Sequence, residues 1–143
     1  MKEIVFLKLG GSLITDKTQP YTPRLEILEN ISAQIRQALN ENPGISLVIG
    51  HGSGSFGHTA AKKYHTRDGL IDYSGMSSKE NILLYEKYWQ GFSQVWFQAS
   101  TLNRFVLEAL HAAGLPVLSL SPAASVISSN GKVKNWDLSP IKS

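Results

Sequence analysis

The chain has 143 residues, which is enough for one domain with a hydrophobic core. Only 17% of the residues are charged and the formal net charge is +3, which excludes a nucleic-acid binder that relies on charge alone and suits a small anionic ligand. The absence of cysteine excludes disulfides and thiolate metal sites. The sequence shows neither a signal-peptide pattern after Met1 nor an apolar run long enough to span a membrane, so we predict a cytoplasmic protein.

The first predicted element is a strand that ends in a glycine turn. Residues 4–9 (IVFLKL) are mostly apolar and predict a strand that is buried on both faces. Lys8 interrupts this strand, and a buried lysine is unfavourable unless its ammonium group reaches water or an anion. Gly10, Gly11 and Ser12 then form a turn at the end of the strand.

A helix is expected to follow a loop that contains two prolines. Thr22 suits the N-cap position of this helix, and Pro23 suits its first helical position. Four apolar residues recur at helical spacing and predict one buried stripe: Leu28, Ile31, Ile35 and Leu39. Residues 45–49 then predict a second buried strand.

The sequence GHGSGSFGH, residues 50–58, follows this second strand and precedes a helix predicted to begin near Thr59. A strand, a glycine-rich turn and a helix in this order direct backbone N–H groups at an anion. Ser53 and Ser55 add hydroxyl donors, and His58 stands where the helix begins, where it can donate to a phosphate or transfer a proton. The alternative is a tight turn that needs glycine only for its geometry.

A long helix is predicted for residues 79–112, with Gly91 as a point where it bends or divides. Four aromatic residues of this helix are expected to lie first of all in the core, with part of them lining an apolar substrate pocket: Tyr85, Trp89, Phe92 and Trp96. Gly114 and Pro116 are expected to end the helix.

The last predicted elements are a strand and a hairpin. Residues 117–120 predict a third buried strand, and Asn130-Gly131 predicts a two-residue hairpin turn within residues 126–133. No element is expected to be completed from residue 134 onward. Strands that alternate with helices predict an α/β fold with a mostly parallel sheet and right-handed crossovers.

Two nucleotide-binding motifs match the second glycine turn only in part. Gly52, Gly54 and Gly57 fit the GxGxxG fingerprint of dinucleotide-binding proteins, but no strand with an acidic residue follows at the required distance. The spacing also resembles a P-loop, but His58 occupies the position of the lysine, and a neutral imidazole does not replace that permanent charge. The sequence therefore disfavours both of these classes.

The pair of glycine turns is the more informative feature. Both turns follow the carboxyl ends of strands, where open α/β sheets bind ligands. If the two strands are neighbours, the turns face each other with Lys8 between them, which suits in-line phosphoryl transfer. Lys17 either folds back onto the phosphates or lies exposed, and Asp16 is either a metal contact or the cap of its loop. Three further histidines have no partner at ligand spacing and are expected to be structural or exposed: His51, His65 and His111.

Two segments carry a family resemblance. KLGGSLITDK, residues 8–17, and HGSGSFGH, residues 51–58, resemble the amino acid kinase superfamily, and within it most closely the isopentenyl phosphate kinases. Residues 102–126 and the hairpin after them also resemble that family. The SFGH ending is the more specific motif, although fosfomycin kinases share it. Ser53 departs from the usual family loop GGGSFGH.

The resemblance implies a three-layer αβα sandwich, of which residues 1–143 are the N-terminal, phosphate-acceptor lobe without the nucleotide-binding half. It implies direct in-line transfer of the γ-phosphate of ATP, with Mg²⁺, onto isopentenyl phosphate to give isopentenyl diphosphate. A homodimer is the expected assembly. A fosfomycin-type antibiotic kinase remains an alternative, as does a non-catalytic anion-binding module for this chain.

The resemblance also assigns roles to individual residues. Lys8 would stabilise the transferring phosphoryl group, Lys17 would assist at the ATP phosphates, and His58 would hydrogen-bond the acceptor phosphate. The remaining substrate-binding positions that it implies are Gly10, Gly11, Gly54, Ser55 and Gly57.

Overall fold

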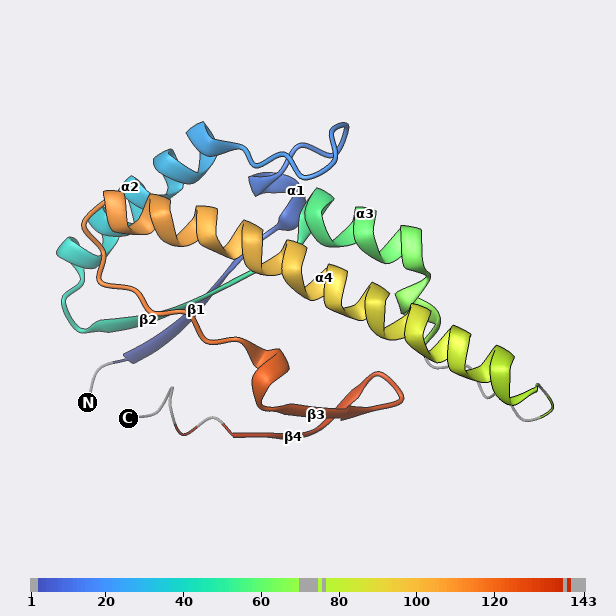
Figure 1. Ribbon diagram of the computed structural model, residues 1–143. Helices are drawn as coiled ribbons and strands as arrows, with labels where there is room; N and C mark the ends of the chain where they lie inside the picture. The colour runs from blue at the N-terminus through green and yellow to red at the C-terminus, as the bar shows by residue number, and fades with distance from the viewer. Residues whose placement is uncertain (1–2, 70–74, 76, 138, 140–143) are drawn as a thin grey trace.

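The computed structural model of the chain describes residues 3–69, 75, 77–137 and 139 (Figure 1). Two parallel strands, β1 (Glu3–Leu9) and β2 (Ile45–His51), form the base of the fold. Two long helices, α2 (Leu25–Glu41) and α4 (Ser78–Ala112), lie on the same side of this strand pair. The prediction of an α/β fold with a parallel sheet is confirmed.

Shorter elements complete the described part of the chain. Helix α1 (Gly11–Ile14) begins directly after β1, and α3 (Gly54–Tyr64) begins shortly after β2. The remaining elements, in chain order, are η1 (Thr66–Asp68), η2 (Pro122–Ala124), β3 (Val126–Ser129) and β4 (Lys132–Trp136). None of the helices in these residues combines the length and the hydropathy that a membrane span requires.

The register of the strand pair brings the two glycine turns to the same edge. Lys8 lies opposite Gly50 and Leu9 lies opposite His51, so both strands end at the same level. The prediction that the two strands are neighbours is therefore confirmed, and the chain connects them through α2.

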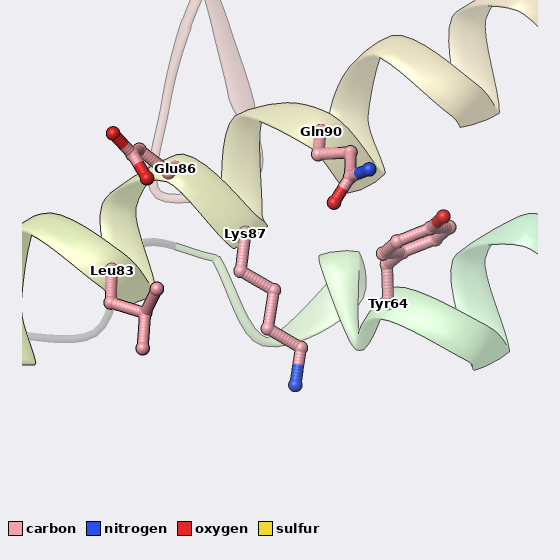
Figure 2. A pocket seen from close by; sticks show the side chains of 5 residues that line it. All are labelled: Tyr64, Leu83, Glu86, Lys87 and Gln90. Carbon is pink, nitrogen blue, oxygen red and sulfur yellow. The ribbon is translucent and has the colours of Figure 1, made fainter.

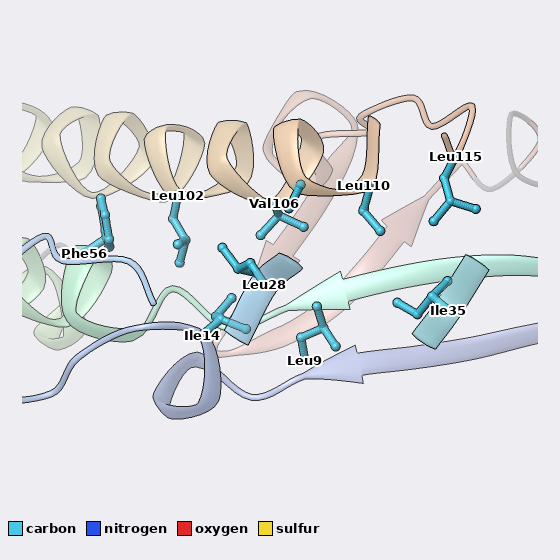
Figure 3. Packing of buried hydrophobic residues seen from close by; sticks show 10 residues of the cluster. Leu9, Ile14, Leu28, Ile35, Phe56, Leu102, Val106, Leu110 and Leu115 are labelled. Carbon is cyan, nitrogen blue, oxygen red and sulfur yellow. The ribbon is translucent and has the colours of Figure 1, made fainter. Parts of the chain in front are cut away.

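The hydrophobic core lies between the strand pair and the helices (Figure 3). Its buried members come from β1, from all four α-helices and from the loop after α4: Leu9, Ile14, Leu28, Ile35, Phe56, Leu102, Val106, Ala109, Leu110 and Leu115. Ile31 and Leu39 pack against this cluster, so the helical stripe predicted for α2 is confirmed.

Strand β1 is buried on one face only. Leu9 is 5% exposed, whereas Ile4 and Phe6 on the opposite face are 43% and 73% exposed. Side chains alternate between the two faces of a strand, and α2 and α4 both cover the same face (Figure 1). The prediction of burial on both faces is therefore wrong for this strand.

Helix α2 begins at Leu25, later than predicted, with Arg24 rather than Thr22 as its N-cap. The preceding residues are held in an extended conformation, because Pro23 pairs with Thr15 in an isolated antiparallel bridge. The backbone N–H of Arg24 also donates to the carbonyl of Ile14 at 2.8 Å. These contacts with Ile14 and Thr15, which are distant in sequence, override the local signal for a helix start at Thr22.

Helix α4 runs without interruption through Gly91. Its start carries a capping box, in which the Ser77 N–H donates to Glu80 Oε2 at 3.1 Å and Ser77 Oγ accepts from the Glu80 N–H. The predicted division at Gly91 is therefore wrong, and this glycine instead allows a close approach. A Cβ at this position would lie 2.4 Å from the Cβ of Tyr64 and 2.8 Å from Cγ2 of Thr66, where the end of α3 crosses α4.

The strand predicted for residues 117–120 does not form. Leu118 is 93% exposed and Leu120 is 56% exposed, and β1 pairs with no described strand other than β2. A buried parallel strand needs a neighbouring strand, and this segment has none within the described residues; Val117 alone packs against the core.

The predicted hairpin is present. Asn130 and Gly131 both have positive φ, at 48° and 70°, as a two-residue turn requires. Strand β4 extends to Trp136, so the expectation of no element from residue 134 onward is wrong for residues 134–136. Residues 138 and 140–143 lie outside the described part of the chain.

The two glycine turns touch each other through their backbones. A Cβ on Gly11 would lie 2.5 Å from the backbone nitrogen of Gly54, and a Cβ on Gly54 would lie 2.1 Å from Thr15 Oγ1. Thr15, which is fully buried, joins the turns: its hydroxyl donates to the Gly11 carbonyl at 2.6 Å and accepts from the Ser55 N–H at 3.0 Å. Sequence analysis missed this residue, because a threonine after a glycine turn carries no local signal.

We predict that Thr15→Val lowers the free energy of unfolding by about 1–3 kcal/mol, because it leaves the buried Ser55 N–H without an acceptor. Thr15→Ser keeps the hydroxyl and should recover most of the loss. Urea denaturation measures both variants. Thr101→Val is the matched control, since its hydroxyl also donates to a carbonyl four residues earlier but lies on an exposed helix surface. A Thr15→Val protein as stable as the original would contradict the bridging role.

Candidate active site

Lys8 lies at the carboxyl end of β1, on the face that the helices leave open. Its neighbours in the strand, Leu7 and Leu9, pack toward the core, so the Lys8 side chain is directed to the opposite side and is exposed. Its ammonium group forms no ion pair with the described residues. An unpaired cation at the edge where both glycine turns begin is placed to meet an anion.

The first turn supplies backbone donors. Gly10 is the N-cap of α1, and its carbonyl accepts the N–H groups of Leu13 and Ile14 at 2.9 and 3.3 Å. The N–H groups that open a helix have no acceptor within it, so those of Gly11 and Ser12 remain directed outward. The expected contact between this turn and a phosphate stays a prediction.

The second turn closes earlier than predicted. The Ser53 carbonyl accepts from the N–H groups of Phe56 and Gly57 at 3.1 and 3.2 Å, so α3 begins at Gly54 and not near Thr59. His58 therefore lies one turn inside α3 and not at its start. The helix start follows from these turn-closing bonds, which the glycine-rich sequence does not reveal.

The structure separates the backbone groups of the second turn into engaged and open ones. The Ser55 N–H is bonded to Thr15 and the Gly57 N–H is bonded to Ser53, so neither is a free donor. The Gly54 N–H has no acceptor within α3. Ser55 Oγ is buried and has no hydrogen-bond partner among the described residues. The Gly54 N–H and the Ser55 hydroxyl are thus two groups of this turn for which the described residues show no hydrogen bond.

His58 is exposed, and its imidazole contacts one side chain. Its Nδ1 lies 3.2 Å from Nη2 of Arg67, which belongs to η1. Arg67 was not singled out in the sequence, because it lies outside both glycine motifs.

The loop after α1 holds Asp16 and Lys17. Asp16 Oδ1 accepts from the hydroxyl and the N–H of Thr18 at 2.7 and 2.8 Å, and these bonds hold the pKa of the Asp16 carboxyl below its ordinary value. Asp16 is therefore the cap of its own loop, one of the two expectations. The Lys17 side chain is exposed, and its ammonium group forms no ion pair with the described residues.

The other histidines are structural or exposed, as expected. His51 is half-buried and bridges its own turn to α4, with Nε2 at 3.1 Å from Asn103 Oδ1 and Nδ1 at 3.2 Å from the Gly52 carbonyl. His65 and His111 are exposed. No three acidic or histidine side chains in the described part of the chain lie close enough together to hold a metal ion.

The aromatic residues of α4 do not form the expected core. Tyr85, Trp89 and Phe92 are 52%, 44% and 44% exposed, and Trp96 is 49% exposed. Tyr85, Trp89 and Phe92 form a ring cluster with Tyr88, in which the Trp89 and Phe92 centroids lie 5.5 Å apart. The stripe that faces α3 lies one position away and includes the buried Gly91. The aromatic stripe and the stripe that contains Gly91 have the same helical spacing, so the spacing does not tell which of them is buried. The close approach of α3 at Gly91 decides that the glycine stripe faces inward.

A hollow of about 570 Å³ lies between α3 and α4 (Figure 2). Its lining comes from the end of α3 and the first half of α4: Tyr64, Leu83, Glu86, Lys87 and Gln90. A smaller hollow of about 110 Å³ beside it is lined by Tyr64, Leu84 and Tyr88, among others. Tyr85, Trp89 and Phe92 line neither hollow, so the expectation that one of them forms a pocket wall is not met here.

Comparison with curated proteins finds two similar archaeal relatives. The chain is 33% identical to the isopentenyl phosphate kinase of Methanocaldococcus jannaschii, over 97% of this chain and 50% of the relative. It is 34% identical to the isopentenyl phosphate kinase of Methanothermobacter thermautotrophicus, over 98% of this chain and 48% of the relative. The chain thus spans about half the length of these curated relatives.

Comparison of folds and of family models agrees with these relatives. A solved structure of an isopentenyl phosphate kinase superposes with a TM-score of 0.81 at 32% identity, over 98% of this chain and 52% of that chain. The family model described as "Amino acid kinase family" matches residues 3–143. The matches agree with the paired glycine turns at the ends of two parallel strands and with the lysine at their edge. The chain belongs to the amino acid kinase family.

Proposed function

We propose that the protein carrying this chain transfers the γ-phosphate of ATP to isopentenyl phosphate, giving isopentenyl diphosphate. The observation that carries the proposal is the direct contact between two glycine turns, with Lys8 at the edge where both begin. The identity to two isopentenyl phosphate kinases supports the choice of substrate. A cytoplasmic enzyme of isoprenoid biosynthesis is the setting in which this reaction fits.

The proposed chemistry needs position and charge more than proton transfer. The acceptor phosphate is already an anion at neutral pH, so its oxygen attacks the γ-phosphorus directly and ADP leaves on the opposite side. Lys8 and the N–H groups of the first turn stabilise the charge that spreads over the transferring group. Lys17 acts on the ATP phosphates. His58, with the Gly54 N–H and the Ser55 hydroxyl, holds the acceptor phosphate in line.

The chain is the acceptor-binding lobe in this proposal, in which the nucleotide-binding residues would lie in the half of the relatives' length that this chain does not span. ATP is expected to bind together with Mg²⁺, which would neutralise charge on its phosphates. The described residues include no group of three acidic or histidine side chains that could hold the ion. No step is therefore assigned to a protein-bound ion. The assembly is a homodimer, for which the exposed aromatic cluster of α4 offers an apolar surface.

The substrate is tested by comparing two acceptors. We expect the whole protein to use isopentenyl phosphate with a kcat/KM about a hundredfold or more above that for fosfomycin. ADP release in a coupled assay measures both values. A reversed preference would assign the protein to the antibiotic kinases. Phosphate binding without turnover of either acceptor would leave an anion-binding module.

Lys8→Ala should lower kcat by about a hundredfold or more while changing KM for the acceptor much less, because the ammonium group acts on charge that develops in the transition state. Steady-state kinetics with saturating ATP separate the two parameters. Lys62→Ala, at an exposed position of α3, is the control and should leave both unchanged. A change confined to KM would make Lys8 a ground-state anchor.

His58→Ala should lower turnover of isopentenyl phosphate by about a hundredfold, the scale for loss of one preorganised donor. His58→Gln retains an N–H donor and should recover part of the activity. His111→Ala, on the exposed last turn of α4, controls for the loss of a histidine elsewhere. Unchanged turnover in His58→Ala would rule out the assigned contact.

A further inference from the structure

The contact between His58 and Arg67 has a defined direction. A guanidinium group carries only donors and stays protonated, so in the 3.2 Å contact Nη2 donates and His58 Nδ1 accepts. An accepting Nδ1 carries no proton, and the proton of the neutral imidazole is then on Nε2. The ring therefore presents an N–H donor at the end that points away from Arg67.

The fold places Arg67 beside His58 by turning the chain back at the end of α3. His65 adopts a left-handed conformation, with φ 54° and ψ 32°, and its carbonyl accepts from the Asp68 N–H at 3.1 Å to close η1. Thr66 packs against α4 at Gly91, and this contact fixes η1 against the long helix. The carboxylate of Asp68 lies 3.8 Å from His65 Nδ1. No ion pair joins it to Arg67 within the described residues, so the guanidinium is left to His58.

We propose that Arg67 is a positioning residue for phosphoryl transfer: it holds the His58 imidazole in the Nε2–H form and fixes its ring, so that Nε2–H donates to the acceptor phosphate. The inference rests on the proposed role of His58. It explains how an exposed histidine on a helix surface is kept in one orientation, since an unrestrained ring samples two flipped positions and loses the benefit of preorganisation.

The contact itself is tested without any substrate. Nitrogen-15 spectra of the imidazole distinguish a protonated Nε2 and a hydrogen-bonded Nδ1 from a free Nδ1. We expect Arg67→Met, which keeps the length but removes the donors, to move the His58 Nδ1 resonance to that of an unbonded nitrogen. Arg67→Gln keeps an N–H donor and should retain part of the shift. Arg104→Met, an exposed arginine paired with Glu108 on α4, should leave His58 unchanged. An unaltered His58 spectrum in Arg67→Met overturns the proposal.

The functional consequence is tested by a double-mutant cycle in the whole protein. Arg67→Met should lower turnover of isopentenyl phosphate about tenfold, the effect of losing one charged hydrogen bond, and Arg67→Gln should restore part of it. In the His58→Ala background, Arg67→Met should cause no further loss, because Arg67 acts through His58. Equal losses in both backgrounds would mean that Arg67 contacts the phosphate itself or acts only on folding, and would overturn the positioning role.

The two measurements separate this inference from the proposed function. If His58→Ala retains full activity while Arg67→Met still changes the Nδ1 resonance, the hydrogen bond exists but His58 does not serve the reaction. The proposed contact between His58 and the acceptor phosphate is then wrong. If His58→Ala loses activity and Arg67→Met changes neither the spectrum nor the rate, the function stands and the role of Arg67 is wrong.

Discussion

The contact between the two glycine turns is the constraint on which the rest of the site depends. Gly11 and Gly54 approach so closely that a Cβ on either would overlap backbone or the Thr15 side chain. Thr15 then ties the turns together with a hydroxyl that donates to one and accepts from the other. Because this contact consists of backbone and one buried side chain, it leaves little freedom for either strand to shift without the other. The parallel register of β1 and β2 and the position of Lys8 are therefore linked to it.

The charges around these turns explain why the site favours an anion. Lys8 has no carboxylate partner among the described residues, and Asp16, the acidic residue that follows the first turn, directs its carboxylate to Thr18. The helix starts at α1 and α3 add N–H groups at the same edge, which reinforces a positive potential there. In the proposed phosphoryl transfer, a site whose cations form no ion pairs among the described residues would bind the substrate's charge without first breaking such pairs.

Several apolar surfaces of the chain lack a covering element. Ile4 and Phe6 lie on the open face of β1, Leu118 and Leu120 extend from the segment after α4, and the aromatic cluster of α4 is half exposed. Exposed apolar surface of this extent is typical of faces that pack against other protein. The curated relatives are about twice as long as this chain.

The sequence by itself determined the elements whose signals are local. Apolar runs gave the two strands, the repeat from Leu28 to Leu39 gave the buried side of α2, and Asn130-Gly131 gave the hairpin, because each depends on residues a few positions apart. The motif resemblance also singled out Lys8 and His58, whose roles stay predictions. The tertiary structure alone decided the late start of α2, the stripe of α4 that faces α3, and the exposed state of residues 118–120. It also revealed Thr15 and Arg67, whose roles come from partners 40 and 9 residues away. Contacts at such distances in sequence leave no periodic trace, and only the folded backbone brings their partners together.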